Sequence, residues 1–182
     1  MAAITAVDIQ FRGSVVAGAA GNSTAFGGVD TSLGKYIANA ILADATLNAL
    51  FSDATGAENA ASAVHYACLF IYNANGANAL QNAVVWVSAD VAGGAAVAIG
   101  VDTVAASALA AAGAQALQIA NRTTAPAAVA FSTPVTFGTG LALGSIPAGS
   151  VKAIWIRRTC SNSAAMSNDG LTVSVQGDTA AA

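Results

Sequence analysis

Two β-type runs close to the end of the chain constrain its fold more than any other feature. Residues 151–158 and 171–176 are rich in Val, Ile and Leu, and a loop rich in Ser, Asn and Gly separates them. Pro147 and Gly149 favour a turn just before the first run. The pattern predicts either a hairpin with a long loop or two strands of a sandwich. No catalytic constellation accompanies these runs, so they favour a role in packing and assembly.

Further strands are expected along the rest of the chain. Residues 64–72 carry apolar side chains on both faces, which is typical of a central strand. Residues 83–88 follow after an Asn-Gly turn. Residues 4–12 alternate, and the expected buried face comprises Thr5, Val7, Ile9 and Phe11. The remaining candidates are residues 95–101, 129–131, 135–137 and 141–143.

Three other segments do not alternate. Residues 32–51 have apolar side chains at helical spacing, which predicts one or two short helices beginning near Ser32. Residues 104–119 are rich in alanine and are predicted as helix from propensity, against the presence of Gly113. Residues 14–31 are rich in Gly and Ala without a period, which indicates an extended arm or loop. We expect this arm to lie over a neighbouring subunit.

The spacing of these elements indicates the fold class. About seven to nine strands recur at intervals marked by turns, which is typical of a β-sandwich. No internal repeat of solenoid length is present. The sequence therefore predicts one all-β domain over residues 1–182, a β-sandwich for which a jelly roll is one arrangement.

Charge is scarce in this chain. Of its 182 residues 8% are charged and 55% are apolar, many of them alanine. A monomer with so few ions has sizeable apolar patches, so the composition favours a subunit that hides its surface in an assembly. A neutral domain built from small residues is the alternative. No stretch resembles the roughly 20 strongly apolar residues of a spanning helix, and no export signal is visible, so we expect a soluble protein made in a cytoplasm and no membrane partner.

The charge pattern also argues against nucleic acid as a partner. The formal net charge is −3, and the six basic residues are scattered except for Arg157 and Arg158. Binding to phosphates needs several clustered Lys or Arg side chains.

The two cysteines, Cys68 and Cys160, stand in no CxxC pair. Two free thiols are the expectation for a cytoplasmic origin, with Cys68 buried and Cys160 at a strand end. A disulfide between them stays open if their strands are neighbours.

No set of residues points to catalysis, a metal or a cofactor. His65 and Cys68 are three residues apart on an expected strand, so their side chains point to opposite faces and form no dyad. A partly buried histidine of a sheet is the simpler interpretation. The acidic residues form no close pair on a strand and no calcium loop. We therefore expect no catalytic, cofactor-binding or metal-binding residues.

Tryptophan and arginine remain as candidates for contact with a partner. On the strand at 151–158, Trp155 and Arg157 share one face while Arg158 lies on the other. Trp and Arg are enriched at interface hot spots. The candidate interface residues are Trp155, Arg157, Arg158, Trp86 and Arg12. The alternative is that Trp155 belongs to the core and the two arginines solvate the end of the strand.

Six motifs follow one another in a defined order. They are Tyr66 with Cys68, Asn75-Gly76, Val85-Trp86-Val87, residues 146–149 (Ile-Pro-Ala-Gly), Trp155 with Arg157-Arg158, and Gly177-Asp178-Thr179. In this order they resemble a group of tailed-bacteriophage virion structural proteins. The resemblance covers residues 64–179, and residues 4–12 agree loosely. The alanine-rich run at 104–119 and the lack of Pro-Ala-Gly after Cys160 depart from the group.

The resemblance implies a β-sandwich subunit of a phage particle without enzymatic activity, located in the virion and assembled in the host cytoplasm. Within the particle we favour a capsid decoration, or cement, protein. Its partners would be the major capsid protein and copies of itself, with a trimer as the first expectation. The alternative is a tail, neck or baseplate component, including a receptor- or carbohydrate-binding module. A hydrolase lacks any motif.

Overall fold

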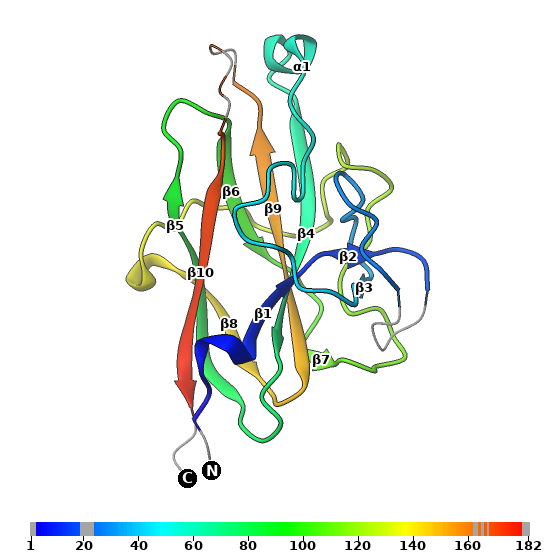
Figure 1. The fold of residues 1–182 in the computed structure, drawn as a ribbon, viewed down its shortest axis with the longest axis vertical. Helices are drawn as coiled ribbons and strands as arrows, with labels where there is room; N and C mark the ends of the chain where they lie inside the picture. Colours follow the sequence, from blue (N-terminus) through cyan, green and yellow to red (C-terminus); the bar gives the residue numbers. More distant parts are fainter. Residues whose placement is uncertain (1–2, 19–23, 162–163, 165, 167, 180–182) are drawn as a thin grey trace.

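The computed structural model describes residues 3–18, 24–161, 164, 166 and 168–179, and β-strands dominate it (Figure 1). The strands are β1 (Ile9–Arg12), β2 (Ser14–Val15), β3 (Tyr36–Ile37), β4 (Val64–Asn73), β5 (Leu80–Asp90), β6 (Ala96–Val101), β7 (Ser107–Ala108), β8 (Leu141–Ile146), β9 (Ser150–Thr159) and β10 (Leu171–Thr179). The helical elements are α1 (Gly56–Ala60) and the 3-10 turns η1 (Ala6–Asp8) and η2 (Phe137–Thr139). Within the described residues, no helix has the length and apolar character needed to cross a membrane. The predicted all-β class is confirmed.

Two antiparallel sheets pack face to face. The larger sheet has the order β1-β4-β9-β6, with β7 also paired to β9, and the smaller sheet has the order β10-β5-β8. Alternate side chains of the two sheets meet between them and form one apolar core. Its buried members are Leu69, Ile71, Leu80, Ala83, Val85, Val87, Ile99, Leu143, Ile146, Ile154 and Ile156. The predicted β-sandwich is therefore confirmed.

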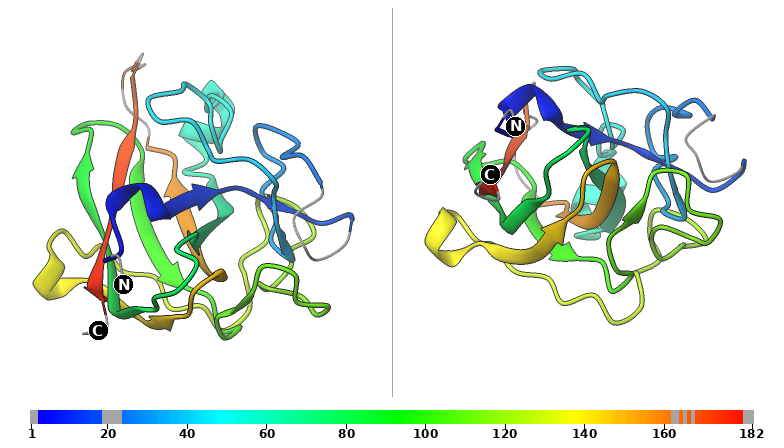
Figure 2. Two further views of the ribbon diagram at one scale, coloured as in Figure 1. Left: turned by 60° about the horizontal axis from the view of Figure 1, so that its bottom comes forward. Right: turned by 90° about the horizontal axis from the view of Figure 1, so that it is seen from below.

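The larger sheet is also covered on its second face. Phe70 and Trp155, which point away from the smaller sheet, belong to a second core with Ile37, Ala116 and Ile119 from long irregular segments. These segments, with β2, β3 and β7, lie on the side of the larger sheet that is remote from β10 and β5 (Figures 1 and 2). Cover on both faces explains why β4 and β9 are apolar on both sides.

The strongest strand predictions are confirmed. β4 lies between β1 and β9, which is the expected central position, and pairs with β9 from Val64↔Thr159 to Tyr72↔Val151. β9 and β10 belong to different sheets, so the two runs that opened the sequence analysis are a sandwich pair and not a hairpin. Cys68 and Cys160 are both buried free thiols, as expected.

The alanine-rich run at 104–119 is not the helix that propensity predicts. It contains the two-residue strand β7 and is otherwise irregular. The backbone N–H groups of Gln115 and Ala116 donate to Lys35 O at 2.7 and 3.2 Å, and that of Ile119 donates to Leu33 O at 3.0 Å. These bonds to a distant segment, together with the burial of Ala116 and Ile119, outweigh helix propensities that differ by about 1 kcal/mol per residue or less.

The helices predicted within residues 32–51 are also wrong. The segment contains β3 and loops, and Lys35, Ala45 and Asn48 have φ values of 78°, 53° and 55°, which a right-handed helix excludes. The α-helix of the structure, α1, begins instead at Gly56, after this segment. Thr55 caps this helix by accepting from Glu58 N at 3.2 Å, while the Glu58 carboxylate accepts from Thr55 N at 2.8 Å.

The N-terminal region is built into the sandwich more firmly than predicted. The strand expected at 4–12 shortens to β1, and Val7 is 82% exposed, so it is not on a buried face; Ile9 and Phe11 pack on the core as predicted. The predicted arm at 14–31 begins with Ser14 and Val15, which are buried in β2. Residues 19–23 of that arm lie outside the described residues. Its first two residues therefore belong to the body of the domain.

The strands expected at 129–131 and 135–137 are not present as such. Ile99 and Ser132 form an isolated bridge with N–H···O distances of 2.8 and 3.0 Å. Pro134 O then accepts from Val87 N at 2.9 Å. The chain is therefore hydrogen-bonded to β5 at Pro134, before β8 pairs with that strand from Leu141 onward. The following residues leave the sheet and form the turn η2.

Candidate interaction surface

Trp155 was expected at an interface, but it lies inside the domain. Its side chain is 0% exposed, and its indole N–H donates to Asp102 Oδ2 at 2.6 Å. Asp102, which is 2% exposed, also accepts from Leu117 N at 2.9 Å and from Val104 N at 2.7 Å. The interface assignment of Trp155 is therefore wrong, because the second core encloses the ring and a buried carboxylate satisfies its polar group.

Lys152, on the other face of β9, is also turned inward. Its Nζ donates to the carbonyl oxygens of Asp102 and Val104 at 2.8 and 2.6 Å. Burial lowers the pKa of Lys152, and the nearby Asp102 charge opposes that shift. This lysine ties the residues after β6 to β9.

Arg157 and Arg158 are engaged within the chain as well. The Arg158 guanidinium lies 4.7 Å from the centre of the Phe51 ring and donates to Ser52 O at 2.8 Å. The Arg157 guanidinium lies 5.2 Å from the centre of the Phe131 ring. Each arginine therefore holds a loop onto the end of the larger sheet, and both side chains stay half-buried; their predicted contact with a partner stays a prediction.

Arg12 has a similar role on β1. It is 9% exposed, it donates to Gln10 Oε1 at 2.6 Å and to Asn39 O at 3.3 Å, and it lies 4.9 Å from the centre of the Tyr72 ring. Burial lowers its pKa, which the Tyr72 side chain partly opposes. The predicted contact of Arg12 with a partner is therefore replaced by contacts within the domain.

A polar cluster around His65 joins the loops at the end that carries α1. Arg158 Nη2 lies 2.9 Å from His65 Nδ1, and His65 Nε2 lies 3.3 Å from Glu58 Oε1. Because a guanidinium can only donate, Nδ1 accepts and Nε2–H donates to the carboxylate, which assigns the neutral tautomer. Arg122 pairs with Glu58 at 2.5 Å and with Asp30 at 2.7 Å.

This arrangement determines how His65 titrates. Burial, Arg122 and Arg158 lower the pKa of His65, while Glu58 and Asp30 oppose them. The predicted structural role of this histidine agrees with its surroundings, since both ring nitrogens already have partners. The Thr55-x-x-Glu58 spacing of a capping box was the sequence signal for α1, and the sequence analysis missed it.

These contacts leave the surface without free cations. Lys35 lies 5.3 Å from the centre of the Tyr36 ring, and with the five basic residues described above it completes the set of six in the sequence. None of the six is classed as exposed, whereas five carboxylates are. The exposed acidic residues are Asp44, Asp53, Asp90, Asp169 and Asp178. The outside of the domain is therefore built from small, apolar and uncharged polar side chains, with acidic points.

Trp86 is the candidate residue that remains near the surface. It lies on the outer face of the smaller sheet, opposite Ser174 of β10, and its ring meets that of Phe137 edge-on at 5.9 Å. Phe137 is 47% exposed and Val135 is 65% exposed. We call residues 135–139 the apolar turn. Figure 1 shows it, in yellow, standing out beside β10 and β5.

Gly140 allows this turn to approach the sheet closely. A Cβ atom at residue 140 would lie 2.2 Å from Val84 Cγ1 and 3.0 Å from Val85 O. The backbone therefore passes where only glycine fits. Trp86 then supports one edge of Phe137, which holds the exposed ring in place.

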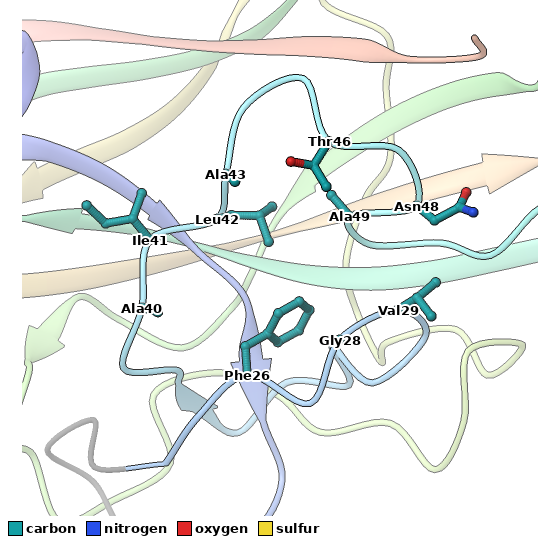
Figure 3. Close-up of a pocket in the computed structure, with 10 residues that line it drawn as sticks. All are labelled: Phe26, Gly28, Val29, Ala40, Ile41, Leu42, Ala43, Thr46, Asn48 and Ala49. Carbon is teal, nitrogen blue, oxygen red and sulfur yellow. The ribbon is translucent and has the colours of Figure 1, made fainter. Parts of the chain in front are cut away.

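An apolar groove opens between two segments on another side of the molecule. Its volume is about 260 Å³. Residues 26–29 form one wall and residues 40–49 the other, and the side chains of Phe26, Leu42 and Thr46 turn toward the space between them (Figure 3). Ile41 and Val29 at its rim are 58% and 40% exposed, and no lining residue is charged. This groove was not predicted from the sequence, since one wall lies in the predicted arm at 14–31 and the other in the helices predicted at 32–51.

No protein-family model, curated protein or solved structure matches this chain. The function has therefore to be argued from the surface itself and from the motifs in the sequence. Among the described residues, no group of three or more His, Cys, Asp or Glu side chains is placed to hold a metal ion.

Proposed function

We propose that this protein is a structural subunit of a bacteriophage particle and that it binds the capsid shell as a decoration, or cement, protein. The observation that carries the proposal is that all six basic side chains are buried or half-buried, which leaves a surface with little charge to keep it hydrated. The order of the Trp, Arg and Ile-Pro-Ala-Gly motifs supports the same conclusion. The role is one of adhesion and not of catalysis.

The exposed apolar side chains suit contacts that are repeated over a large surface. Val135, Phe137, Ile41 and Leu47 are 47–69% exposed, so completing their burial contributes about 1–2 kcal/mol each. Association of two proteins costs on the order of 4–15 kcal/mol. Isolated contacts of this kind are therefore weak, whereas a shell that presents many equivalent neighbours makes them effective through multivalency.

A carbohydrate- or receptor-binding role at a tail, neck or baseplate has less support. Such sites stack sugars on exposed aromatic rings held by a concave surface. Within the described part of the chain, Phe137 is the aromatic residue classed as exposed, and it stands on a projecting turn. The tail alternative therefore remains second.

The number of copies per particle tests the proposal. In purified particles of the virus that encodes this chain, quantitative mass spectrometry should find hundreds of copies, in a fixed ratio to the major capsid protein. Purified protein added to particles that lack it should sediment with them. A handful of copies per particle would favour the tail or neck alternative. Absence from the particle, with no binding to shells, would refute a virion role.

The binding assay has a matched pair of variants. Phe137→Ser removes the exposed ring and should reduce cosedimentation if the apolar turn faces the shell. Asp53→Asn changes an exposed side chain outside the apolar turn and should leave cosedimentation unchanged. Equal effects of the two substitutions would exclude the apolar turn as a shell contact.

A further inference from the structure

The apolar turn carries an exposed ring, and the apolar groove has room for one. The turn presents one phenylalanine ring, flanked by Val135, on a segment that stands out from the sheet. The groove has a volume of about 260 Å³ and is lined by Phe26, Leu42 and other apolar or small side chains. An apolar cavity of about 150 Å³ lined by Leu, Ile and Phe is known to accept benzene. One aromatic ring therefore fits the groove.

The two features also match in charge. Residues 132–142 contain no charged residue, and none of the residues that line the groove is charged. Elsewhere the exposed charges are carboxylates, so two copies of this chain cannot form ion pairs through exposed cations and repel each other where their acidic points meet. A contact between copies is least opposed where both surfaces are neutral and apolar, as they are here.

The chain cannot fill its own groove with its own turn. The turn lies on the outer side of the smaller sheet, whereas residues 40–49 run past β1, where Leu42 N donates to Phe11 O at 2.8 Å, and the turn and these loops lie apart in Figures 1 and 2. The two patches are different surfaces, so a contact between them is heterologous, or head-to-tail. Such contacts build a closed ring or an open array according to the rotation between neighbours.

We propose that the apolar turn of one copy inserts Phe137 into the groove between residues 26–29 and 40–49 of a second copy. Trp86 and Gly140 pre-organise the ring for insertion, which lowers the entropic cost of the contact. This contact extends the proposed structural role. It is tested on the isolated protein, so its failure is separate from a failure of shell binding.

Site-directed cross-linking tests the contact directly. One chain carries Gly138→Cys, beside the Phe137 ring at a position where an added Cβ has nothing within 4 Å, and a second chain carries Thr46→Cys in the groove; the native thiols of Cys68 and Cys160 are buried. On mixing under mild oxidation, the pair should form a disulfide-linked dimer at least tenfold faster than Thr46→Cys mixed with Val7→Cys. Val7 is 82% exposed and belongs to neither patch, so it controls for random collision.

A second measurement covers variants that alter the turn too strongly. Sedimentation velocity of the unmodified chain should show a mass that rises above 17.6 kDa with concentration. Val135→Ser and Phe137→Ser should each move that rise to at least tenfold higher concentration, and Phe137→Leu should restore most of it. Circular dichroism confirms that each variant is folded.

Three results would overturn the inference. One is cross-linking of the mixed pair at the rate of the Val7→Cys control. Another is a Gly138→Cys chain that cross-links to itself faster than to the Thr46→Cys chain, since that means turn meets turn. The third is a chain that stays at 17.6 kDa at every concentration.

Discussion

Replacing Asp102 by alanine should cost much of the stability of this domain. The carboxylate accepts three hydrogen bonds from buried or partly buried donors: the Trp155 indole N–H and the backbone N–H groups of Leu117 and Val104, at 2.6–2.9 Å. Each donor left without a partner costs about 1–3 kcal/mol. The loss should therefore be at least about 3 kcal/mol, out of a typical total of about 5–15 kcal/mol.

Urea unfolding followed by tryptophan fluorescence and circular dichroism measures this loss. A change of about 3 kcal/mol alters the unfolding equilibrium constant more than a hundredfold, since each 1.4 kcal/mol is tenfold. Asp53→Ala provides the matched control, because Asp53 is exposed, and it should change stability by about 0.5 kcal/mol or less. Asp102→Asn should lie between the two, since an amide still offers one acceptor oxygen.

A double-mutant cycle assigns part of the loss to the indole bond. Trp155→Phe removes the N–H donor and keeps an aromatic ring in the second core. If the Asp102–Trp155 bond contributes as argued, the double variant should lose less stability than the sum of the losses of the two single variants. The difference should be at least about 1 kcal/mol. Additive effects, or an Asp102→Ala variant as stable as the unmodified chain, would refute the reasoning.

Three further outcomes follow from other contacts. Gly34→Ala should prevent native folding or destabilise it severely, because a Cβ there would lie 1.8 Å from Leu117 O at a φ of +90°; soluble yield and thermal unfolding measure it, and a tolerated alanine contradicts the geometry. The folded-state pKa of His65 is below the value of 6.5 for the unfolded chain, so the unfolded state takes up the proton first and stability falls as pH drops below about 6.5. Urea midpoints at pH 7.5 and 5 should therefore differ less in His65→Gln than in the unmodified chain, and equal differences would contradict this assignment. Gly140→Ala should displace the apolar turn and reduce the Gly138→Cys cross-link while far-UV circular dichroism is retained; an unchanged cross-linking rate would show that glycine is not required there.

Strands predicted from a pattern of burial on both faces were placed correctly, whereas the helix predicted from residue propensity was wrong. β4 and β9 were predicted nearly to their ends, because alternation with apolar residues on both faces reflects burial on both sides of a sheet. The helix at 104–119 was predicted from propensity alone. That signal is small beside the backbone hydrogen bonds that this run makes to residues 33 and 35.

The candidate interface residues were also predicted from a local signal, the type of side chain. Residue type pointed to Trp155, Arg157, Arg158 and Arg12, yet a type that is common at interfaces is equally suited to binding the chain's own loops. Phe137 and the groove were missed, because exposure depends on what covers a side chain and no local pattern reports it. The apolar groove in particular is formed by two segments that were predicted as an arm and a helix.

By itself, the sequence determined the all-β class, the central strands and a chain too poor in charge to cover itself with charged side chains. These properties follow from composition and from a two-residue period, which are local. Only the tertiary structure decided that the two cysteines stay free, that no cation is fully exposed, and that one aromatic turn and one apolar groove face outward on different sides. Those outcomes depend on which distant segments meet, since a buried charge needs partners that lie far along the chain.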